Sequence, residues 1–316
     1  MLVWLMAAVG LIILLLAGDM LVRGAVNLAL RVGIPALIVS LTIVAFGTSA
    51  PELLVSLKAV ADNKAGLALG NVVGSNTANI LLVLGLPAIL AVMNTSQHDT
   101  RKSYALMLGA TALFILLALR GEFDIWSGLL FLGVLVLSLL DQGRDALSHR
   151  RAEKCADDTA DLEGADTSMP RWKIALYLVL GLVGLPIGAS LLVNSASEIA
   201  RNYGVSETVI GLTLVALGTS LPELATTVMA ALRRQADVAL GNVIGSNFFN
   251  LMGIIGVTSL FGRIPVDLSD FTFDLVVMAG VSLLLVPFVY FRRDITRIWG
   301  IVLSALYVAY VAAVLV

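Results

Sequence analysis

The feature that most constrains this chain is its succession of apolar runs, each long enough to cross a lipid bilayer. Reading these runs between polar breaks predicts about ten helices, at 2–22, 34–60, 67–92, 103–119, 123–140, 173–200, 205–232, 238–261, 270–290 and 295–316. About 20 apolar residues are enough for one span. Only 13% of the residues are charged, against about 25% in an average soluble domain. We therefore predict an all-α, multi-pass membrane protein that lies in a lipid bilayer.

One polar stretch divides the predicted spans into two sets of five. Residues 141–172 are rich in Asp, Glu, Arg and Ala, which is typical of a solvated linker. The predicted organisation is a first five-helix repeat at 1–140, a linker at 141–172 and a second five-helix repeat at 173–316. The first apolar run lacks the basic start of a signal peptide, so we interpret it as a retained helix.

The basic residues indicate an orientation. Of the 20 Lys and Arg residues, fifteen fall on one predicted face and five on the other. Cytoplasmic loops carry the excess of basic residues, so the linker is predicted to be cytoplasmic and both termini to face outward. We expect a plasma (inner) membrane location.

The two halves contain an ungapped sequence repeat. Shifting the sequence by 171 residues aligns 33–85 with 204–256, with 23 identical residues in 53 positions. The aligned signatures are GTSAPEL (47–53) with GTSLPEL (218–224), and ALGNVVGSN (68–76) with ALGNVIGSN (239–247). Because each half has an odd number of predicted spans, the second copy is predicted to lie inverted in the membrane. Inverted repeats are typical of transporters, which hold substrate near the midplane between the repeats.

Glu52 and Glu223 occupy equivalent places in the two copies, each deep in a predicted span. An ionised side chain at such a depth costs about 2.5–3.5 kcal/mol on insertion scales, so it indicates function. The inverted arrangement predicts that both carboxylates meet at one site. Because neither repeat helix carries a Lys or Arg to neutralise them, they suit a divalent metal that prefers oxygen ligands. The alternative is a protonated glutamate with a structural hydrogen bond.

Further polar residues share helix faces with these acids at i, i+4 spacing. They are Thr48 and Ser56 with their copies Thr219 and Thr227, and Asn71, Ser75 and Asn79 with their copies Asn242, Ser246 and Asn250. Pro51 and Pro222 lack an N–H group and predict a helix break in each copy, with carbonyl oxygens freed for a cation. Serine and threonine also bond to the backbone of ordinary membrane helices, so the roles of Ser56 and Thr227 stay open.

The glycine pairs Gly70–Gly74 and Gly241–Gly245 have GxxxG spacing. We interpret them as close helix packing rather than as part of a site. Neither Cys nor His accompanies the acids, which argues against zinc or copper.

These motifs resemble the two alpha repeats of the cation/calcium exchanger superfamily, whose best-known members are sodium/calcium exchangers. The resemblance rests on GTSAPE and GTSLPE, followed by GNVVGSNTAN and GNVIGSNFFN. It implies a prokaryotic sodium/calcium exchanger-like protein, a secondary antiporter rather than an enzyme. The transported ions would be Ca²⁺ and Na⁺, with no cofactor and no nucleic-acid partner. The internal pseudo-dimer is compatible with a functional monomer.

The resemblance also implies the cation ligands. Glu52 and Glu223 would bind Ca²⁺ between them, and backbone oxygens of Thr48 and Thr219 would complete the shell. The remaining expected ligands, mainly for Na⁺, are the carbonyls of Ala45 and Ala216, the hydroxyls of Ser75 and Ser246, the central Asn79 and Asn250, and the motif serines Ser49 and Ser220. The helices predicted at 2–22 and 173–200 would form the moving bundle.

Some relatives, including potassium-dependent exchangers, carry Asp where this chain has Asn250, which argues against potassium co-transport. There are three alternatives to sodium/calcium exchange. The same acids could exchange Ca²⁺ or another divalent cation for H⁺, although the Ser, Thr and Asn ligands favour Na⁺. A channel more often has symmetric subunits than an internal inverted repeat. A membrane hydrolase would need a nucleophile with an activating base, or a HExxH motif, and the sequence shows neither.

Overall fold

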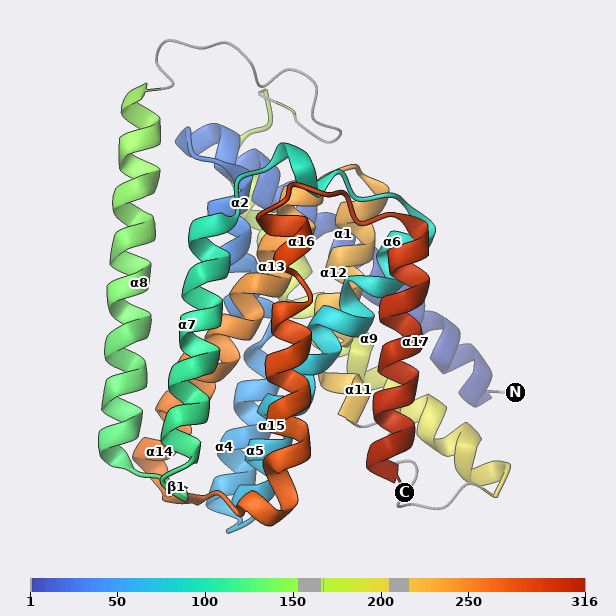
Figure 1. Cartoon of the computed structure of the whole chain (residues 1–316). Coiled ribbons are helices and arrows are strands. Elements are labelled where there is room, and N and C mark those ends of the chain that lie inside the picture. The colour runs from blue at the N-terminus through green and yellow to red at the C-terminus, as the bar shows by residue number, and fades with distance from the viewer. Residues whose placement is uncertain (1, 153–165, 167, 205–215, 316) are drawn as a thin grey trace.

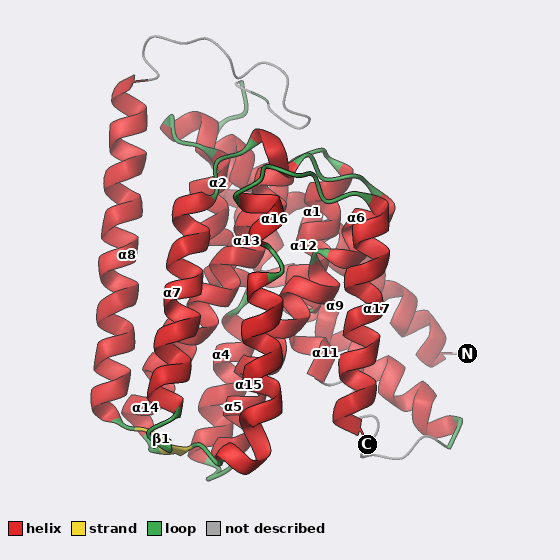
Figure 2. Cartoon of the chain, viewed as in Figure 1, coloured by secondary structure: helices red, strands yellow, loops and turns green. Residues whose placement is uncertain are grey.

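The structure is a computed structural model, and it describes residues 2–152, 166, 168–204 and 216–315. Figure 2 shows that helix makes up nearly all of this part, with most of the loops at the two ends of the bundle. The predicted helix 205–232 and the predicted linker 141–172 lie partly outside the described residues.

The first half contains α1 (Leu2–Val32), α2 (Ala36–Val39), the π-helical turn η1 (Ser40–Val44), α3 (Ala45–Thr48), α4 (Ala50–Ala61), α5 (Ala65–Ala78), the π-helical turn η2 (Asn79–Val83), α6 (Gly85–Leu90), the 3₁₀ turn η3 (Thr95–Gln97), α7 (Arg101–Ala118), β1 (Glu122–Phe123) and α8 (Ile125–Ala152). The second half contains α9 (Arg171–Asn202), α11 (Ala216–Thr219), α12 (Leu221–Leu232), α13 (Ala236–Phe249), the π-helical turn η6 (Asn250–Ile254), α14 (Ile255–Phe261), β2 (Ile264–Pro265), α15 (Leu268–Leu283), α16 (Val286–Val289) and α17 (Arg297–Leu315).

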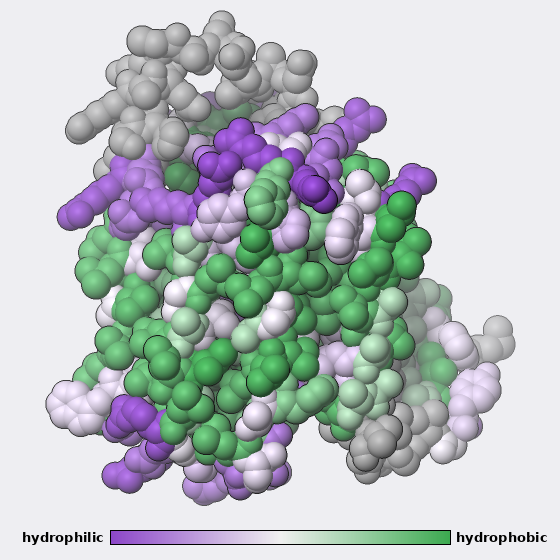
Figure 3. All heavy atoms as spheres, in the orientation of Figure 1, coloured by the Kyte–Doolittle hydropathy of each residue, from purple (hydrophilic) through white to green (hydrophobic). Residues whose placement is uncertain are grey.

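The membrane character of the chain is confirmed. Among the described residues, eight helices are long and apolar enough to cross a bilayer, and the pair Ala36–Thr48 and Ala50–Ala61, bent by 42°, makes a ninth if counted as one span. Figure 3 shows a broad apolar belt between two polar ends. The number of ten spans and the inversion of the repeats stay predictions.

Two helices run further than the sequence predicted. α1 continues through Val32 instead of ending at 22, and the charges at the expected end are paired: Asp19 forms ion pairs with Arg23, one turn along the same helix, and with Arg233. α8 continues past 140 to Ala152, where Asp141 and Asp145 both pair with Lys102. In each case a charge that marks a polar break in the sequence has a partner on a neighbouring element or on the next turn.

α1 and α9 pack along one another as an antiparallel pair, which lies obliquely at one side of the bundle in Figure 1. Glycines allow this approach. A Cβ on Gly188 would lie 2.7 Å from the backbone N of Leu14, and a Cβ on Gly10 would lie 2.7 Å from the backbone N of Leu192. No side chain other than hydrogen fits at such positions without moving backbone.

The central helices are the spans Ala65–Leu90 and Ala236–Phe261, which are the most buried. They carry the two copies of the GNVxGSN signature. β1 and β2 form a short antiparallel pair, with Glu122 opposite Pro265 and Phe123 opposite Ile264. This pair joins the end of α7 to the end of α14 at one end of the bundle.

The turns that lead into the two central helices share one geometry. Asn63 and Arg234, which are 171 residues apart, both have positive φ, at 58° and 56°. The next residue donates the same hydrogen bond in each copy: Lys64 N to Ala59 O at 2.7 Å, and Gln235 N to Ala230 O at 2.8 Å. The duplicated sequence therefore produces duplicated local structure, even where residue types differ.

We expect Gly188→Val to destabilise the protein by about 1–3 kcal/mol, because the new side chain must push the α1 backbone away. Thermal unfolding in detergent, followed by size-exclusion chromatography, measures this. Gly109→Val in α7 is the matched control, since no described atom lies within 4 Å of a Cβ there. Equal stability of the two variants would contradict the close packing of α1 on α9.

Candidate cation-binding site

Two helix breaks, one in each half, create the site. α3 ends at Thr48 and α4 begins at Ala50, so Ser49 lies between them, with φ −84° and ψ 4°. Ser220 has nearly the same conformation, φ −86° and ψ 2°, between α11 and α12. Such values are sparsely populated in general and are common among functional residues. The breaks that Pro51 and Pro222 predict are therefore present, and each proline lies in the first turn of the second segment, where it needs no N–H partner.

Glu52 and Glu223 lie in the first turns of α4 and α12 and are fully buried, at 1% and 0% exposure. The N-terminal end of a helix carries a partial positive charge, which favours a carboxylate at this place. Ser49, three residues before Glu52, contacts the Glu223 carboxylate, so the two glutamates belong to one site. The structure thus brings together the two acids that the repeat singled out.

The serines at the breaks make crossed contacts. Ser49 Oγ donates a hydrogen bond to Glu223 Oε1 at 2.9 Å. Ser220 lies beside Glu52, and Thr48 and Ser246 lie beside Glu223. The break in each half therefore faces the acid of the other half.

Two asparagines brace the broken helices. Asn71 Nδ2 donates to the backbone O of Glu52 at 3.2 Å and to Ser56 Oγ at 3.0 Å. Asn242 repeats both contacts, to the backbone O of Glu223 at 3.4 Å and to Thr227 Oγ1 at 3.2 Å. These contacts give Ser56 and Thr227, whose roles the sequence left open, a structural part.

The bracing also crosses between the halves. Thr48 Oγ1 donates to Asn242 Oδ1 at 3.3 Å, and Thr219 Oγ1 donates to Asn71 Oδ1 at 3.5 Å. Asn71 and Asn242 were recognised in the sequence as polar helix faces but were not included among the expected ligands. Their i, i+4 spacing with Ser75 and Ser246 is the signal that places them at the site.

Asn79 and Asn250 each begin a π-helical turn, η2 and η6, inside the central helices. Single π-helical turns are rare and occur often at functional sites. Asn79 Nδ2 donates to Asn247 Oδ1 at 3.0 Å, and Asn250 Nδ2 donates to Ser75 Oγ at 3.1 Å. Asn247 also donates to the backbone O of Asn76 at 3.2 Å. Asn76 and Asn247, which the sequence analysis did not single out, therefore hold the two central helices together.

Several buried oxygen atoms at this centre have no hydrogen-bond partner within the described part of the chain. They are Glu52 Oε2, Glu223 Oε2, Asn79 Oδ1, Asn250 Oδ1, Asn76 Oδ1, Ser220 Oγ and Ser246 Oγ. Buried polar atoms normally have partners, and leaving one without a partner costs about 1–3 kcal/mol. A concentration of unpaired oxygens around two carboxylates fits a hard cation, which takes carboxylate, amide and hydroxyl oxygens as ligands.

Among the twelve expected ligands, Ser49, Ser220, Thr48 and Ser246 lie beside one of the two acids. Ser75, Asn79 and Asn250 take part in the contacts between the two central helices. The Ala45 backbone O accepts from Ser49 N at 3.1 Å and from Thr48 Oγ1 at 3.3 Å. Ala216 begins α11, and its side chain is outside the described set. Among the described residues, no three His, Cys, Asp or Glu side chains form a metal cluster. Coordination of a cation by these ligands stays a prediction.

The packing interpretation of the GxxxG glycines holds for the second copy. A Cβ on Gly245 would lie 2.6 Å from Leu41 O and 2.7 Å from Ala45 Cβ, so α13 lies directly against η1 and α3. For Gly74 no described atom lies within 4 Å of a Cβ. The segment equivalent to η1 falls within 205–215, outside the described residues.

Comparisons with known proteins agree on one family. The family model described as sodium/calcium exchanger protein matches residues 2–142 and 173–316. The sodium/calcium exchanger MaX1 of Methanosarcina acetivorans is 32% identical over 343 residues, covering 97% of each chain. The inner membrane protein YrbG of Escherichia coli is 35% identical over 280 residues, covering 87% of this chain and 85% of its own.

A solved structure of the sodium-calcium exchanger NCX_Mj, soaked with Na⁺ and Ca²⁺, has the same fold. Its TM-score is 0.81 at 31% identity, and the match covers 99% of this chain and 98% of that chain.

We expect Asn242→Ala to lower stability by about 2–4 kcal/mol, because it leaves Thr48, Thr227 and the Glu223 carbonyl without their shared partner. Thermal unfolding without divalent cations measures this effect apart from ion binding. Asn202→Ala, at the exposed end of α9, serves as the control. The bracing role is wrong if both variants unfold at the wild-type temperature.

Proposed function

This chain belongs to the sodium/calcium exchanger protein family and is a cation/Ca²⁺ antiporter, and we propose that Na⁺ is the cation exchanged for Ca²⁺, by alternating access. The related proteins are membrane ion exchangers, so this chain is a transporter rather than an enzyme. MaX1 and NCX_Mj are both named as exchangers of sodium and calcium. These names support Na⁺ as the coupling ion without excluding H⁺.

The observation that carries the proposal is the pair of buried glutamates, each placed opposite the broken helix of the other half. Two ionised carboxylates supply a charge of −2, which one Ca²⁺ balances. The proposed Ca²⁺ ligands are Glu52 and Glu223, with the backbone oxygens of Thr48 and Thr219. Proximity of Ser49 to Glu223 at 2.9 Å supports one compact site in which both halves contribute ligands.

Na⁺ would compete for the same acids. The proposed additional Na⁺ ligands are the carbonyls of Ala45 and Ala216, the hydroxyls of Ser49, Ser220, Ser75 and Ser246, and the amide oxygens of Asn79 and Asn250. Three Na⁺ against −2 leave +1, so a 3:1 exchange, as the family resemblance implies, would be electrogenic. One charge moved across 100 mV is worth about 2.3 kcal/mol, which lets the membrane potential help to drive exchange.

We propose that α1 and α9 move together past the site. They pack on one another along their length, and α9 passes over the glycines of both GTS motifs. A Cβ on Gly218 would lie 2.6 Å from Val193 Cγ2, and a Cβ on Gly47 would also meet Leu182 of α9. Because Gly47 and Gly218 have no side chains, α9 can move past these two positions without a steric clash. We also propose that both termini face outward, that the protein lies in the plasma (inner) membrane and that it functions as a monomer.

Glu52→Gln and Glu223→Gln should each reduce sodium-driven Ca²⁺ uptake by more than about tenfold, because each removes half of the negative charge that binds Ca²⁺. The measurement is ⁴⁵Ca²⁺ uptake into vesicles loaded with Na⁺ and diluted into sodium-free medium at fixed pH. Glu122→Gln in β1, a half-buried acid paired with Arg263 away from the site, is the control and should transport normally.

The same vesicles separate Na⁺ from H⁺. Uptake that requires the outward Na⁺ gradient at clamped pH supports the proposal. Ca²⁺ uptake that is independent of Na⁺ and follows an imposed pH gradient would support the same site with H⁺ as the coupling ion. If both glutamine variants transport as wild type does, the site itself is refuted.

Ser75→Ala and Ser246→Ala should raise the Na⁺ concentration that half-inhibits Ca²⁺ binding by about 3- to 10-fold. Each variant loses one proposed hydroxyl–Na⁺ contact, which we take to be about as strong as one hydrogen bond. Ca²⁺ affinity without Na⁺ should change less, because hydroxyls are proposed for Na⁺ only. Calorimetric Ca²⁺ titrations at several Na⁺ concentrations measure both quantities. An equal loss of Ca²⁺ and Na⁺ affinity would contradict this division of ligands.

A further inference from the structure

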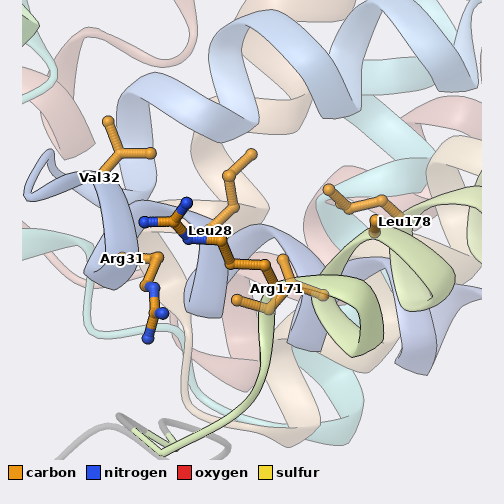
Figure 4. Close-up of a pocket in the computed structure, with 7 residues that line it drawn as sticks. Leu28, Arg31, Val32, Arg171 and Leu178 are labelled. Carbon is orange, nitrogen blue, oxygen red and sulfur yellow. The ribbon is translucent and has the colours of Figure 1, made fainter.

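A pocket of about 350 Å³ lies away from the glutamate site, between the end of α1 and the start of α9. Figure 4 shows its lining, with Arg31 and Arg171 near one end and Leu178 toward the other. The lining residues are Leu28, Arg31, Val32, Arg171, Ile174, Ala175 and Leu178. Two of the seven are arginines, and the remaining five are apolar.

The pocket forms where the packing of the two helices stops. A Cβ on Gly24 would lie 2.9 Å from Leu178 Cγ and 3.1 Å from Leu178 N, so the helices touch there. One turn further along α1, Leu28 is only half-buried, and Arg31 and Val32 are exposed. α9 has no glycine between Arg171 and Leu180 to continue the close approach. The two helices therefore leave a gap at their ends instead of closing it.

Some cations on the same predicted face are paired with acids in the described structure. Lys102 pairs with Asp141 and Asp145, and Arg233 pairs with Asp19. Arg31 and Arg171 form no salt bridge with any residue that the structure describes. Two like charges next to one small pocket repel each other, and an anion between them would remove that repulsion.

The shape and chemistry of the pocket select the class of anion. The two arginines lie where α1 ends and α9 begins, while Leu28, Ile174 and Leu178 form an apolar wall within the two membrane-spanning helices. Free phosphate would use the arginines and leave that wall bare. A molecule with a phosphate at one end and a hydrocarbon chain at the other matches both parts, and basic pockets between membrane helices bind such lipids.

We propose that this pocket binds an anionic phospholipid, with the phosphate held between Arg31 and Arg171 and an acyl chain against Leu28, Ile174 and Leu178. The positive-inside distribution assigns this end to the cytoplasmic leaflet. The site joins α1 to α9, so a bound lipid links the ends of the two helices. Its existence depends only on the membrane location of the chain and not on the ion that is transported.

Native mass spectrometry of the purified full-length protein tests the proposal, with phosphatidylglycerol or phosphatidylcholine added to the detergent solution. Wild type should retain phosphatidylglycerol, and the double variant Arg31→Gln, Arg171→Gln should bind it about 30-fold more weakly. The matched control is Arg144→Gln with Arg293→Gln, which removes two exposed cations of the same predicted face outside the pocket. That control should bind as wild type does.

The charge-conserving variant Arg31→Lys, Arg171→Lys keeps the test informative if the glutamine variant unfolds, because it should fold and retain most of the binding. Equal phosphatidylglycerol binding by the pocket and control variants would overturn the proposal. Equal retention of phosphatidylcholine and phosphatidylglycerol by wild type would also overturn it. Displacement of the lipid by millimolar inorganic phosphate would assign the arginines to a free anion instead.

Discussion

The structure depends on one unfavourable interaction, the repulsion between two carboxylates buried in the middle of a membrane protein. Glu52 and Glu223 are both almost completely inaccessible to solvent, and two negative charges at one buried site repel each other. Such a pair is stable only if the surrounding fold fixes its geometry and if a cation binds at the site. The partial positive charge of two helix starts, at α4 and α12, offsets part of this repulsion, and a cation offsets the rest.

The rest of the central architecture can be understood as support for that pair. Breaking a helix in the bilayer frees backbone groups, which must find partners inside the protein. Asn71 and Asn242 supply those partners, since each bonds to the carbonyl of a glutamate and to a hydroxyl one turn further along. Several buried oxygens of the glutamates, asparagines and serines have no hydrogen-bond partner in the described structure, so the fold combines bracing contacts with oxygens left for a cation. A site that has to bind and release ions in each cycle needs both properties.

Much of this was predictable from the sequence. A repeat of 53 residues with 23 identities gave the paired acids, the proline breaks and the polar helix faces, because these residues lie close to one another along the chain. Contacts between the two halves were not predictable in detail. The periodicity of the sequence does not show that Ser49 contacts Glu223. It also does not show that Asn247 bonds to Asn76 and Asn79. Such contacts depend on how two helices that are distant in the sequence pack together. Helix ends were the least accurate part, as the extension of α1 to Val32 shows, because a polar residue in the sequence does not by itself end a helix.

The two halves are similar without being equivalent, and this has an energetic consequence. At aligned positions, α1 carries Asp19 and Arg23, whereas α9 carries Ser190 and Asn194. Asp19 forms ion pairs with Arg23 and with Arg233, which follows α12. Asn194 instead donates a hydrogen bond of 3.3 Å to the neutral Ser190 hydroxyl. Arg233 aligns with Asp62, so the charge pattern at one end of the bundle is not repeated at the other. A transporter with identical halves would have two access states of equal energy, because exchanging the halves would convert one state into the other. Under the proposed alternating-access mechanism, the ion pair of Asp19 with Arg233 has only a neutral contact at the aligned positions of α9, so the two access states would differ in energy before an ion binds.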